Sequence, residues 1–190
     1  GNFLDETNIT LPKKELSSDK FRICFLGRLV PLKSVDQLII AIKNLSSIFK
    51  DIELILIGDG KSKKSLEKLV SYYNIKKNVI FLGYLEDPLE YLYNSNVLVI
   101  PSLTEGTSRS ALEALYHGIP CIMRDTLGNR ELIDDKMRGL LFKNNKELEN
   151  MIAEIYKKKE YYQSLKDTCL LKNENRQDYC TQIALKKIYE

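Results

Sequence analysis

The sequence predicts an α/β fold: a doubly wound, Rossmann-like parallel sheet of about six strands, with helices on both faces and a helical C-terminal segment. Three observations support this prediction. Short, nearly continuous apolar runs end at Gly or Pro, as expected of strands buried on both faces of a parallel sheet. Segments with apolar residues at helical spacing separate these runs. The alternation of the two patterns continues over about 120 residues.

Each predicted element follows from one of these patterns. The six strands are expected, in chain order, at residues 21–27, 52–58, 78–82, 96–100, 120–123 and 139–142. The helices are expected at residues 34–49, 62–73, 86–94, 108–117 and 146–158. In the first helix the apolar side chains recur at intervals of three or four, which places them on one face. They are Val35, Leu38, Ile39, Ile42, Leu45 and Phe49.

The length of 190 residues predicts one compact domain with a substantial core. Residues 1–20 have the character of a tether, and the chain begins without a methionine, so we expect a truncated N-terminus. Residues 21–172 form the predicted domain. Residues 173–190 are polar and then amphipathic, which indicates a terminal helix that packs on something outside this chain.

The composition excludes several classes of function. A net charge of +3 is too small to argue for nucleic acid binding. No apolar run reaches the ~18 residues of a membrane span, and no signal peptide opens the chain. The four cysteines lack the paired spacing of a zinc site and favour a reducing cytoplasm. Cys24 and Cys121 lie in apolar runs, where a thiol acts as a small hydrophobic side chain.

Ligands of doubly wound sheets bind at the carboxyl ends of the strands. That rule selects four segments for one crevice: Gly27-Arg28, Gly58-Asp59-Gly60, Gly83-Tyr84 and residues 102–110. The last segment, which runs from a strand through a glycine turn into a helix, is the most informative stretch of the chain.

Glu105, Gly106, Thr107 and Ser108 form this turn. Gly106 allows close approach of a ligand, and Thr107 or Ser108 can cap the following helix, whose N–H groups favour an anion. The alternative is an ordinary strand-to-helix turn with a capping box made by Ser110 and Glu113. That alternative does not explain Glu105, whose carboxylate is a strong acceptor for sugar hydroxyls. Glu113 is equally suited to ribose hydroxyls.

Arg28 and Lys33 follow Gly27 at the end of the first predicted strand. Both can reach a diphosphate, Arg28 through its planar guanidinium and Lys33 as a point charge. Simple solvation is the alternative for two cations in a loop. The expected opening of this loop onto the same crevice as Glu105 favours the diphosphate.

The remaining candidates are weaker. The glycines at 58 and 60 indicate a tight turn first and closeness to a ligand second; the segment is not a dinucleotide fingerprint, because position 63 is Lys. His117, the only histidine, is expected to cap a helix or face solvent rather than take part in catalysis. The lysines at 61–64 and 157–159 are interpreted as solvated helix faces.

Together these residues resemble the C-terminal domain of retaining glycosyltransferases of the GT-B fold, group 1 (family 4). The match runs from about Phe21 to Phe142 and rests on five motifs in order at compatible spacing. They are Gly27-Arg28-Leu29 with Lys33, Gly58-Asp59-Gly60, Val79 to Gly83, the Glu-x7-Glu element of Glu105 and Glu113, and Ala114 to Pro120.

The resemblance implies a domain that binds a nucleoside diphosphate sugar as the donor. Glu105, Arg28 and Lys33 would be the catalytic residues, with the two cations on the diphosphate and Glu105 on the sugar. Glu113 would bind the ribose. The remaining predicted donor contacts are Gly27, Gly58, Tyr84, Gly106, Thr107, Ser108, Arg109 and Ser110.

The resemblance also implies what lies outside this chain. A second Rossmann-like domain would precede it and supply the acceptor site, and residues 1–20 and 173–190 would be the interdomain linker and the helix that crosses back. The implied reaction transfers a sugar with retention to a glycan or lipid-linked acceptor, without cofactor or essential metal. The implied location is the cytoplasm, at the inner face of the cytoplasmic membrane, with membrane contact through the missing half. The isolated domain is expected to be inactive.

Three departures from the family pattern affect these expectations. Ser34 stands where the family usually has glycine, which predicts a differently shaped Lys33 loop. Thr107 and Ser108 replace a commoner Phe-Gly or Phe-Pro pair, and residues 127–131 keep only part of a Gly-Gly-x-x-Glu turn. The alternative function is a non-catalytic nucleotide-binding or assembly module of the same fold. An epimerase or a phosphorylase would be further enzyme alternatives.

Overall fold

A single six-stranded sheet forms the centre of the molecule. The computed structural model describes residues 19–106, 108–133 and 139–174, and within them all strand pairings are parallel, in the order β3-β2-β1-β4-β5-β6. The strands are β1 (Phe21–Leu26), β2 (Ile52–Ile57), β3 (Val79–Gly83), β4 (Val97–Ile100), β5 (Cys121–Arg124) and β6 (Gly139–Phe142). The predicted fold class is confirmed.

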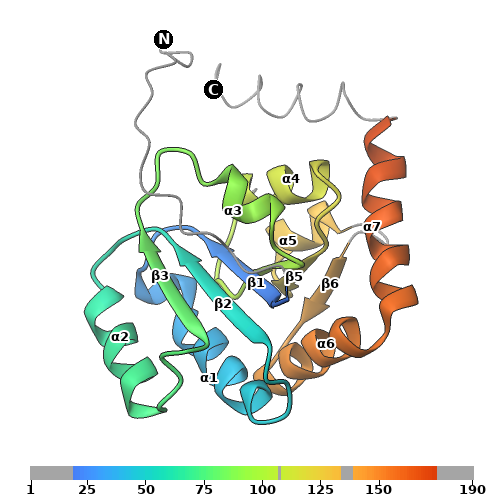
Figure 1. Ribbon diagram of the computed structural model, residues 1–190. Coiled ribbons are helices and arrows are strands. Elements are labelled where there is room, and N and C mark those ends of the chain that lie inside the picture. The colour runs from blue at the N-terminus through green and yellow to red at the C-terminus, as the bar shows by residue number, and fades with distance from the viewer. Residues whose placement is uncertain (1–18, 107, 134–138, 175–190) are drawn as a thin grey trace, which may run out of the picture.

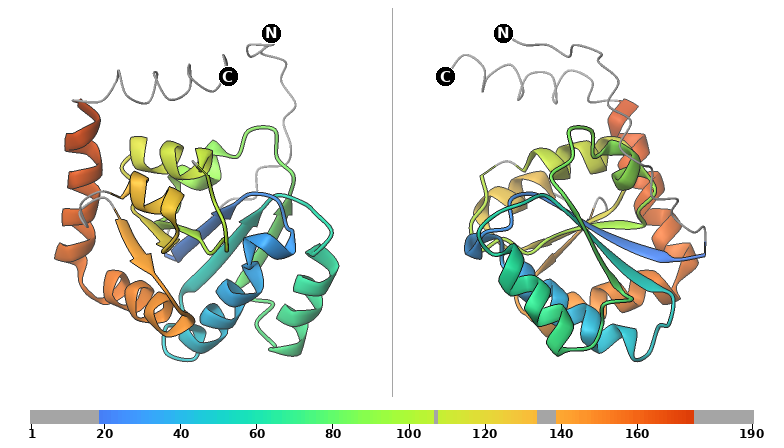
Figure 2. Two further views of the ribbon diagram at one scale, coloured as in Figure 1. Left: turned by 180° about the vertical axis from the view of Figure 1, so that it is seen from behind. Right: turned by 60° about the vertical axis from the view of Figure 1, so that its left-hand side comes forward.

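Helices cover both faces of this sheet (Figures 1 and 2). The helical elements are η1 (Pro31–Lys33), α1 (Val35–Ser46), α2 (Lys63–Tyr72), α3 (Leu89–Tyr93), α4 (Arg109–Tyr116), α5 (Leu127–Leu132), α6 (Asn145–Lys157) and α7 (Lys159–Glu174). The sequence did not predict the short 3-10 helix η1 or the six-residue helix α5. Residues 1–18, 107 and 175–190 lie outside the described part, so most of the predicted linker and terminal helix is not described.

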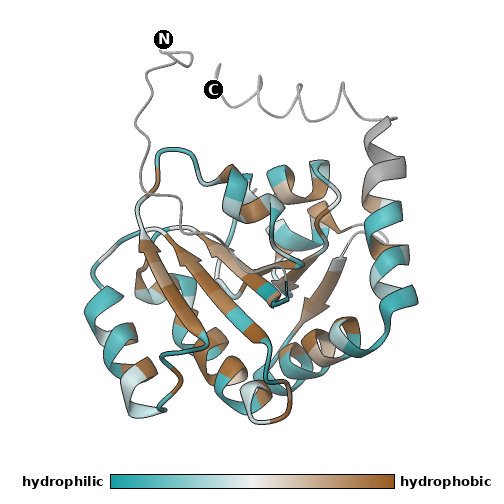
Figure 3. Ribbon diagram, in the orientation of Figure 1, coloured by the Kyte–Doolittle hydropathy of each residue, from teal (hydrophilic) through white to brown (hydrophobic). Residues whose placement is uncertain are grey.

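Alternation along each strand divides the core into two layers. In β2, Leu54 and Leu56 pack in the cluster that includes side chains of α1, α2 and α6. Ile55 and Ile57 point the other way, into the cluster with α3, α4 and α5. Both layers are apolar, so the strands are mostly brown in Figure 3, while the helices show more teal. Cys24 and Cys121 are buried thiols of the second layer, as predicted.

The strand order reverses at the centre of the sheet. β1 pairs with β2 on one side and with β4 on the other, so the chain winds outward in both directions from this pair. The loops that leave β1 and β4 therefore turn to opposite faces, and a crevice opens between them at the carboxyl edge. That reversal sets the position of the candidate site.

Candidate functional site

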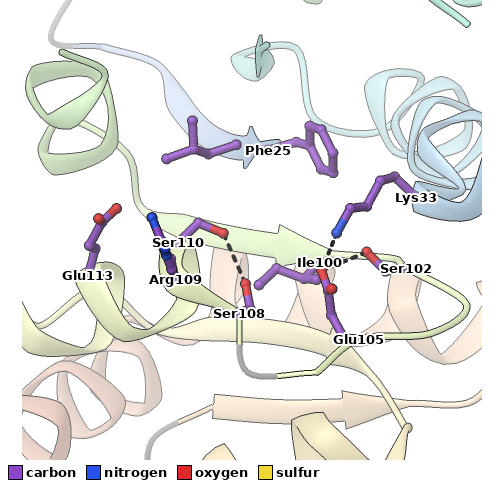
Figure 4. A pocket seen from close by; sticks show the side chains of 10 residues that line it. Phe25, Lys33, Ile100, Ser102, Glu105, Ser108, Arg109, Ser110 and Glu113 are labelled. Carbon is purple, nitrogen blue, oxygen red and sulfur yellow. Dashed lines mark hydrogen bonds and ion pairs between the residues drawn. The ribbon is translucent and has the colours of Figure 1, made fainter. Parts of the chain in front are cut away.

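A pocket of about 300 Å³ opens at the carboxyl ends of β1 and β4. It is lined by Phe25, Leu26, Lys33, Ile100, Ser102, Glu105, Ser108, Arg109, Ser110 and Glu113 (Figure 4). Six of these side chains were predicted site residues; the apolar strand ends were not, because a buried strand residue gives no chemical signal. Two loops that are far apart in the sequence therefore meet in one pocket.

Lys33 and Glu105 form an ion pair across this pocket. The Lys33 Nζ lies 2.5 Å from the Glu105 Oε1, and the side chains are only 20% and 15% exposed. The backbone strengthens the junction, because the N–H of Leu103 donates to the carbonyl of Leu32 at 2.9 Å. The prediction that these two loops converge is confirmed.

Ser102 also binds the carboxylate of Glu105. It is fully buried, and its Oγ donates to the Glu105 Oε1 at 3.1 Å. The loop that carries Ser102 is itself fixed by Arg124, whose Nε donates to the carbonyl of Pro101 at 2.9 Å and whose Nη2 donates to the Gln37 Oε1. Arg124 was missed by the sequence reasoning, because its role depends on contacts with residues distant in the chain.

The N-terminus of α4 forms the floor of the pocket. Ser108 is the N-cap, and its Oγ accepts from the N–H of Ala111 at 3.4 Å and lies 3.1 Å from the Ser110 Oγ. Ser108 is therefore the capping residue, and the alternative of a capping box at Ser110 is wrong. The first N–H groups of a helix have no intrahelical partner, so this end can bind an anion.

Glu113 and Arg109 lie at the other end of the pocket from Lys33 (Figure 4). Partial burial raises the pKa of Glu113 above its ordinary value of 4.5, and the positive charges of Arg109 and His117 partly oppose that rise. The pocket thus has an acid at each end and cationic groups beside both acids. Such an arrangement suits a ligand with a central anion and hydroxyl groups on either side.

The Lys33 loop keeps a compact shape without glycine. Ser34 lies in the left-handed region, at φ 47° and ψ 40°, and its N–H donates to the carbonyl of Pro31 at 3.0 Å. This conformation favours glycine and carries a small strain for serine. Although serine replaces the usual glycine at position 34, its backbone has the conformation that a glycine would adopt.

Two glycines allow backbone segments to meet around the pocket. A Cβ at Gly128 would lie 2.3 Å from the carbonyl oxygen of Glu105 and 2.5 Å from that of Gly106, so Gly128 lets α5 support the turn. A Cβ at Gly58 would lie 2.0 Å from the carbonyl oxygen of Gly27. Gly58 is thus required by packing between loops, which the tight-turn interpretation did not include.

Several predicted site residues do not line the pocket. Arg28 and Tyr84 are exposed on neighbouring loops, and Tyr84 is 76% exposed. Gly27 and Gly58 belong to the same row of strand ends, since the N–H of Gly58 donates to the carbonyl of Gly83 at 2.7 Å. Gly106 faces open space. Thr107 lies outside the described residues. The roles of these residues stay predictions.

His117 caps the end of α4 and does not line the pocket. Its Nε2 lies 2.8 Å from the Tyr93 hydroxyl. The expected position at the end of a helix is confirmed. Within the described residues, no three or more His, Cys, Asp or Glu side chains cluster in a way that could hold a metal ion. The described helices include none with the length and hydropathy needed to span a membrane.

Comparison with known proteins identifies the family. The model of the glycosyl transferases group 1 family matches residues 7–169. The chain belongs to this family. A relative from Escherichia coli, the UDP-Gal:α-D-GlcNAc-diphosphoundecaprenol α-1,3-galactosyltransferase, is 32% identical over 133 residues, which are 68% of this chain and 34% of that enzyme. The chain spans about a third of the length of the curated relatives that it matches.

Solved structures of other proteins share the fold. The Staphylococcus aureus protein TarM, crystallised with fondaparinux, α-GlcNAc-glycerol and UDP, aligns with a TM-score of 0.80 at 23% identity, covering 96% of this chain and 37% of that one. The C-terminal domain of the group 1 protein LpcC of Francisella tularensis aligns with a TM-score of 0.71 at 22% identity, covering 78% and 82%. This group 1 chain therefore has the fold of the family's C-terminal domain.

Proposed function

We propose that this chain is the donor-binding domain of a retaining glycosyltransferase of family 4, which moves a sugar from a nucleoside diphosphate sugar to a glycan or glycolipid acceptor. One observation supports the proposal above the others. Lys33, Glu105 and the N-terminus of α4 meet in a single pocket at the reversal point of the sheet. Membership of the group 1 family supports sugar transfer as the reaction.

The pocket suits each part of the donor. Lys33 and the free N–H groups at the start of α4 would bind the diphosphate. Glu105 would accept hydrogen bonds from the sugar, and Glu113 from the ribose at the other end of the pocket. Arg28 is proposed as a second diphosphate contact from its exposed loop.

The remaining predicted residues would contact other parts of the bound donor. Ser108, Arg109 and Ser110 line the pocket and would contact the phosphates. Gly27, Gly58 and Tyr84 would lie near the base, on the row of strand ends beside the pocket. Gly106 and Thr107 complete the proposed set, with Gly106 facing open space where a ligand can approach.

The proposed chemistry requires stabilisation of a departing diphosphate. The bond from the anomeric carbon to the diphosphate oxygen breaks while the acceptor oxygen bonds to that carbon from the same face, which retains the configuration. Negative charge accumulates on the leaving diphosphate, and Lys33 with the dipole of α4 would stabilise it in the transition state. These groups supply the positive charge for this step, so we propose that no cofactor or essential metal is needed.

A second domain of the whole protein would provide the acceptor site. The chain spans only about a third of its curated relatives, which leaves room in them for such a domain. The E. coli relative is named for a lipid-linked acceptor, diphosphoundecaprenol. We therefore propose a cytoplasmic protein that works at the inner face of the cytoplasmic membrane in polysaccharide or lipopolysaccharide biosynthesis.

Calorimetric titration of the chain with UDP, GDP and ADP tests the donor site. One of the three should bind, and Lys33→Met should weaken that binding about tenfold or more, because a charge-assisted phosphate contact is lost. Lys158→Met is the matched control, since the exposed Lys158 pairs with Glu154 at 2.6 Å at the C-terminal end of α6. Equal affinity for both lysine variants would contradict the placement of the diphosphate.

A donor screen on the longer parent protein tests the reaction. The expected result is transfer from one class of nucleotide sugar with retention of the anomeric configuration, measured by NMR of the product. A parent protein that binds the nucleotide stoichiometrically but transfers no sugar from any donor would favour the non-catalytic module.

A further inference from the structure

The ion pair in the pocket uses the lysine that a phosphate would need. The Lys33 Nζ is 2.5 Å from the Glu105 Oε1 in this partly buried site, so the carboxylate of Glu105 neutralises the ammonium group of Lys33. A phosphate that reaches Lys33 therefore competes with Glu105 for the ammonium group. It also meets the charge of the carboxylate at short range, where screening by water is weaker than at an open surface.

The two oxygens of Glu105 have different surroundings. Oε1 accepts from Lys33 and from the buried Ser102, which together fix the orientation of the carboxylate. Within the part of the chain that the structure describes, Oε2 has no such donor. Glu105 can therefore accept one further hydrogen bond from a ligand hydroxyl without releasing either partner.

The donor, a nucleoside diphosphate sugar, and the product, the free nucleoside diphosphate, differ in the charge that they bring near the Glu105 carboxylate. In a nucleoside diphosphate sugar the terminal phosphate is esterified by the sugar. Removal of the sugar frees a phosphate oxygen with a pKa of about 6, so the product carries roughly one more negative charge near neutral pH. The product also lacks the sugar hydroxyls that can donate to Oε2.

We propose that Glu105 is a specificity residue that favours the sugar-bearing nucleoside diphosphate over the free nucleoside diphosphate by charge. This inference rests on the proposed function and concerns the same pocket. The carboxylate repels the additional charge of the product and binds a hydroxyl that only the donor has. Product is thereby exchanged for fresh donor, although both share the contacts to Lys33 and α4.

Glu105→Gln tests this role because glutamine keeps the shape of the side chain and removes its charge. Titrations of the chain with inorganic pyrophosphate, with UDP, GDP and ADP, and with their glucose esters would give the affinities. The variant should bind pyrophosphate and the free nucleotide about fivefold more tightly than the wild type. It should not bind the glucose ester more tightly, so the preference for donor over product falls by about fivefold or more.

Two further variants keep the test decisive. Glu154→Gln removes the acid of a Lys–Glu pair at the C-terminal end of α6, outside the pocket, and should leave all affinities unchanged. Glu105→Asp keeps the negative charge and should keep most of the discrimination against the free diphosphate. If Asp behaves as Gln does, charge is not the cause and the inference is wrong.

The remaining outcomes separate this inference from the proposed function. If the wild type binds a nucleotide and its sugar ester, and Glu105→Gln leaves their affinity ratio unchanged, the inference fails while the donor site stands. Weaker binding of pyrophosphate by Glu105→Gln would also overturn it, because Glu105 would then assist the anion. If the wild type binds neither nucleotides nor pyrophosphate, the proposed function and the inference fail together.

Discussion

Two glutamates of one pocket have different electrostatic environments. Glu105 is paired with Lys33 and held by Ser102, so its charge is compensated. Glu113 lies at the other end, where partial burial raises its pKa despite the nearby charges of Arg109 and His117. The residue type alone does not distinguish these cases, because the difference arises from neighbours that the fold brings together.

The raised pKa of Glu113 predicts a dependence of stability on pH. The native carboxyl keeps its proton to a higher pH than the unfolded one, so its contribution to stability is greatest below about pH 4.5 and is lost as pH rises through the native pKa. Glu113→Gln removes this loss. The free energy of unfolding of the variant should equal that of the wild type near pH 3 and exceed it at pH 7. Urea denaturation of both proteins at the two pH values measures this difference. A difference that does not change with pH would contradict the assignment.

At the scale of elements, the pocket depends on the close packing of short helices that the sequence did not predict. η1 presents Lys33, and α5 supports the turn that carries Glu105. Neither helix is long enough to give a periodic pattern. Their positions are fixed by backbone contacts at the carboxyl edge of the sheet.

Gly128→Ala tests the support that α5 gives to the Glu105 turn. The added Cβ would lie 2.3 Å from the Glu105 carbonyl oxygen, so α5 and the turn must separate. The expected loss is about 1–3 kcal/mol of unfolding free energy, with weaker phosphate binding. Gly106→Ala is the matched control for stability, because its Cβ would meet no atom within 4 Å. Urea denaturation gives both values, and equal losses would argue against the contact.

At the scale of the whole molecule, the carboxyl ends and the amino ends of the strands carry different features. The pocket lies at the carboxyl edge, whereas Arg22 and Glu53 at the amino ends of β1 and β2 form an ion pair of 3.0 Å with side chains 6% and 12% exposed. A parallel sheet keeps these edges apart by the length of a strand. We therefore expect that a substitution at the amino edge changes stability without changing binding at the carboxyl edge.

Glu53→Gln tests this separation. The substitution removes the carboxylate of the Arg22–Glu53 ion pair, while Arg22 keeps a further interaction, and should cost about 1–3 kcal/mol of unfolding free energy. Nucleotide and pyrophosphate affinities should stay unchanged at temperatures where the variant is folded, since the pocket lies at the opposite edge. Thermal denaturation and titration would be measured on the same preparation. A parallel loss of affinity would show that the edges are coupled.

Much of this architecture could be predicted from local patterns. Strands such as β2 are apolar on both faces, and helices such as α1 have one apolar stripe, so each type follows from spacing. The convergence of Lys33 and Glu105 followed from the rule for parallel sheets. The cap at Ser108, the left-handed Ser34 and the support from Gly128 could not be assigned, because each depends on the path of the backbone.

The sequence by itself determined the fold class, the family resemblance and the identity of the charged groups at the strand ends, because spacing and residue type are local properties. The tertiary structure decided which of these groups share a pocket. It brought Lys33 onto Glu105 and left Arg28 and Tyr84 exposed on loops outside the pocket. The reason is physical: the reversal between β1 and β4 and the glycine contacts between loops fix distances that no local pattern contains.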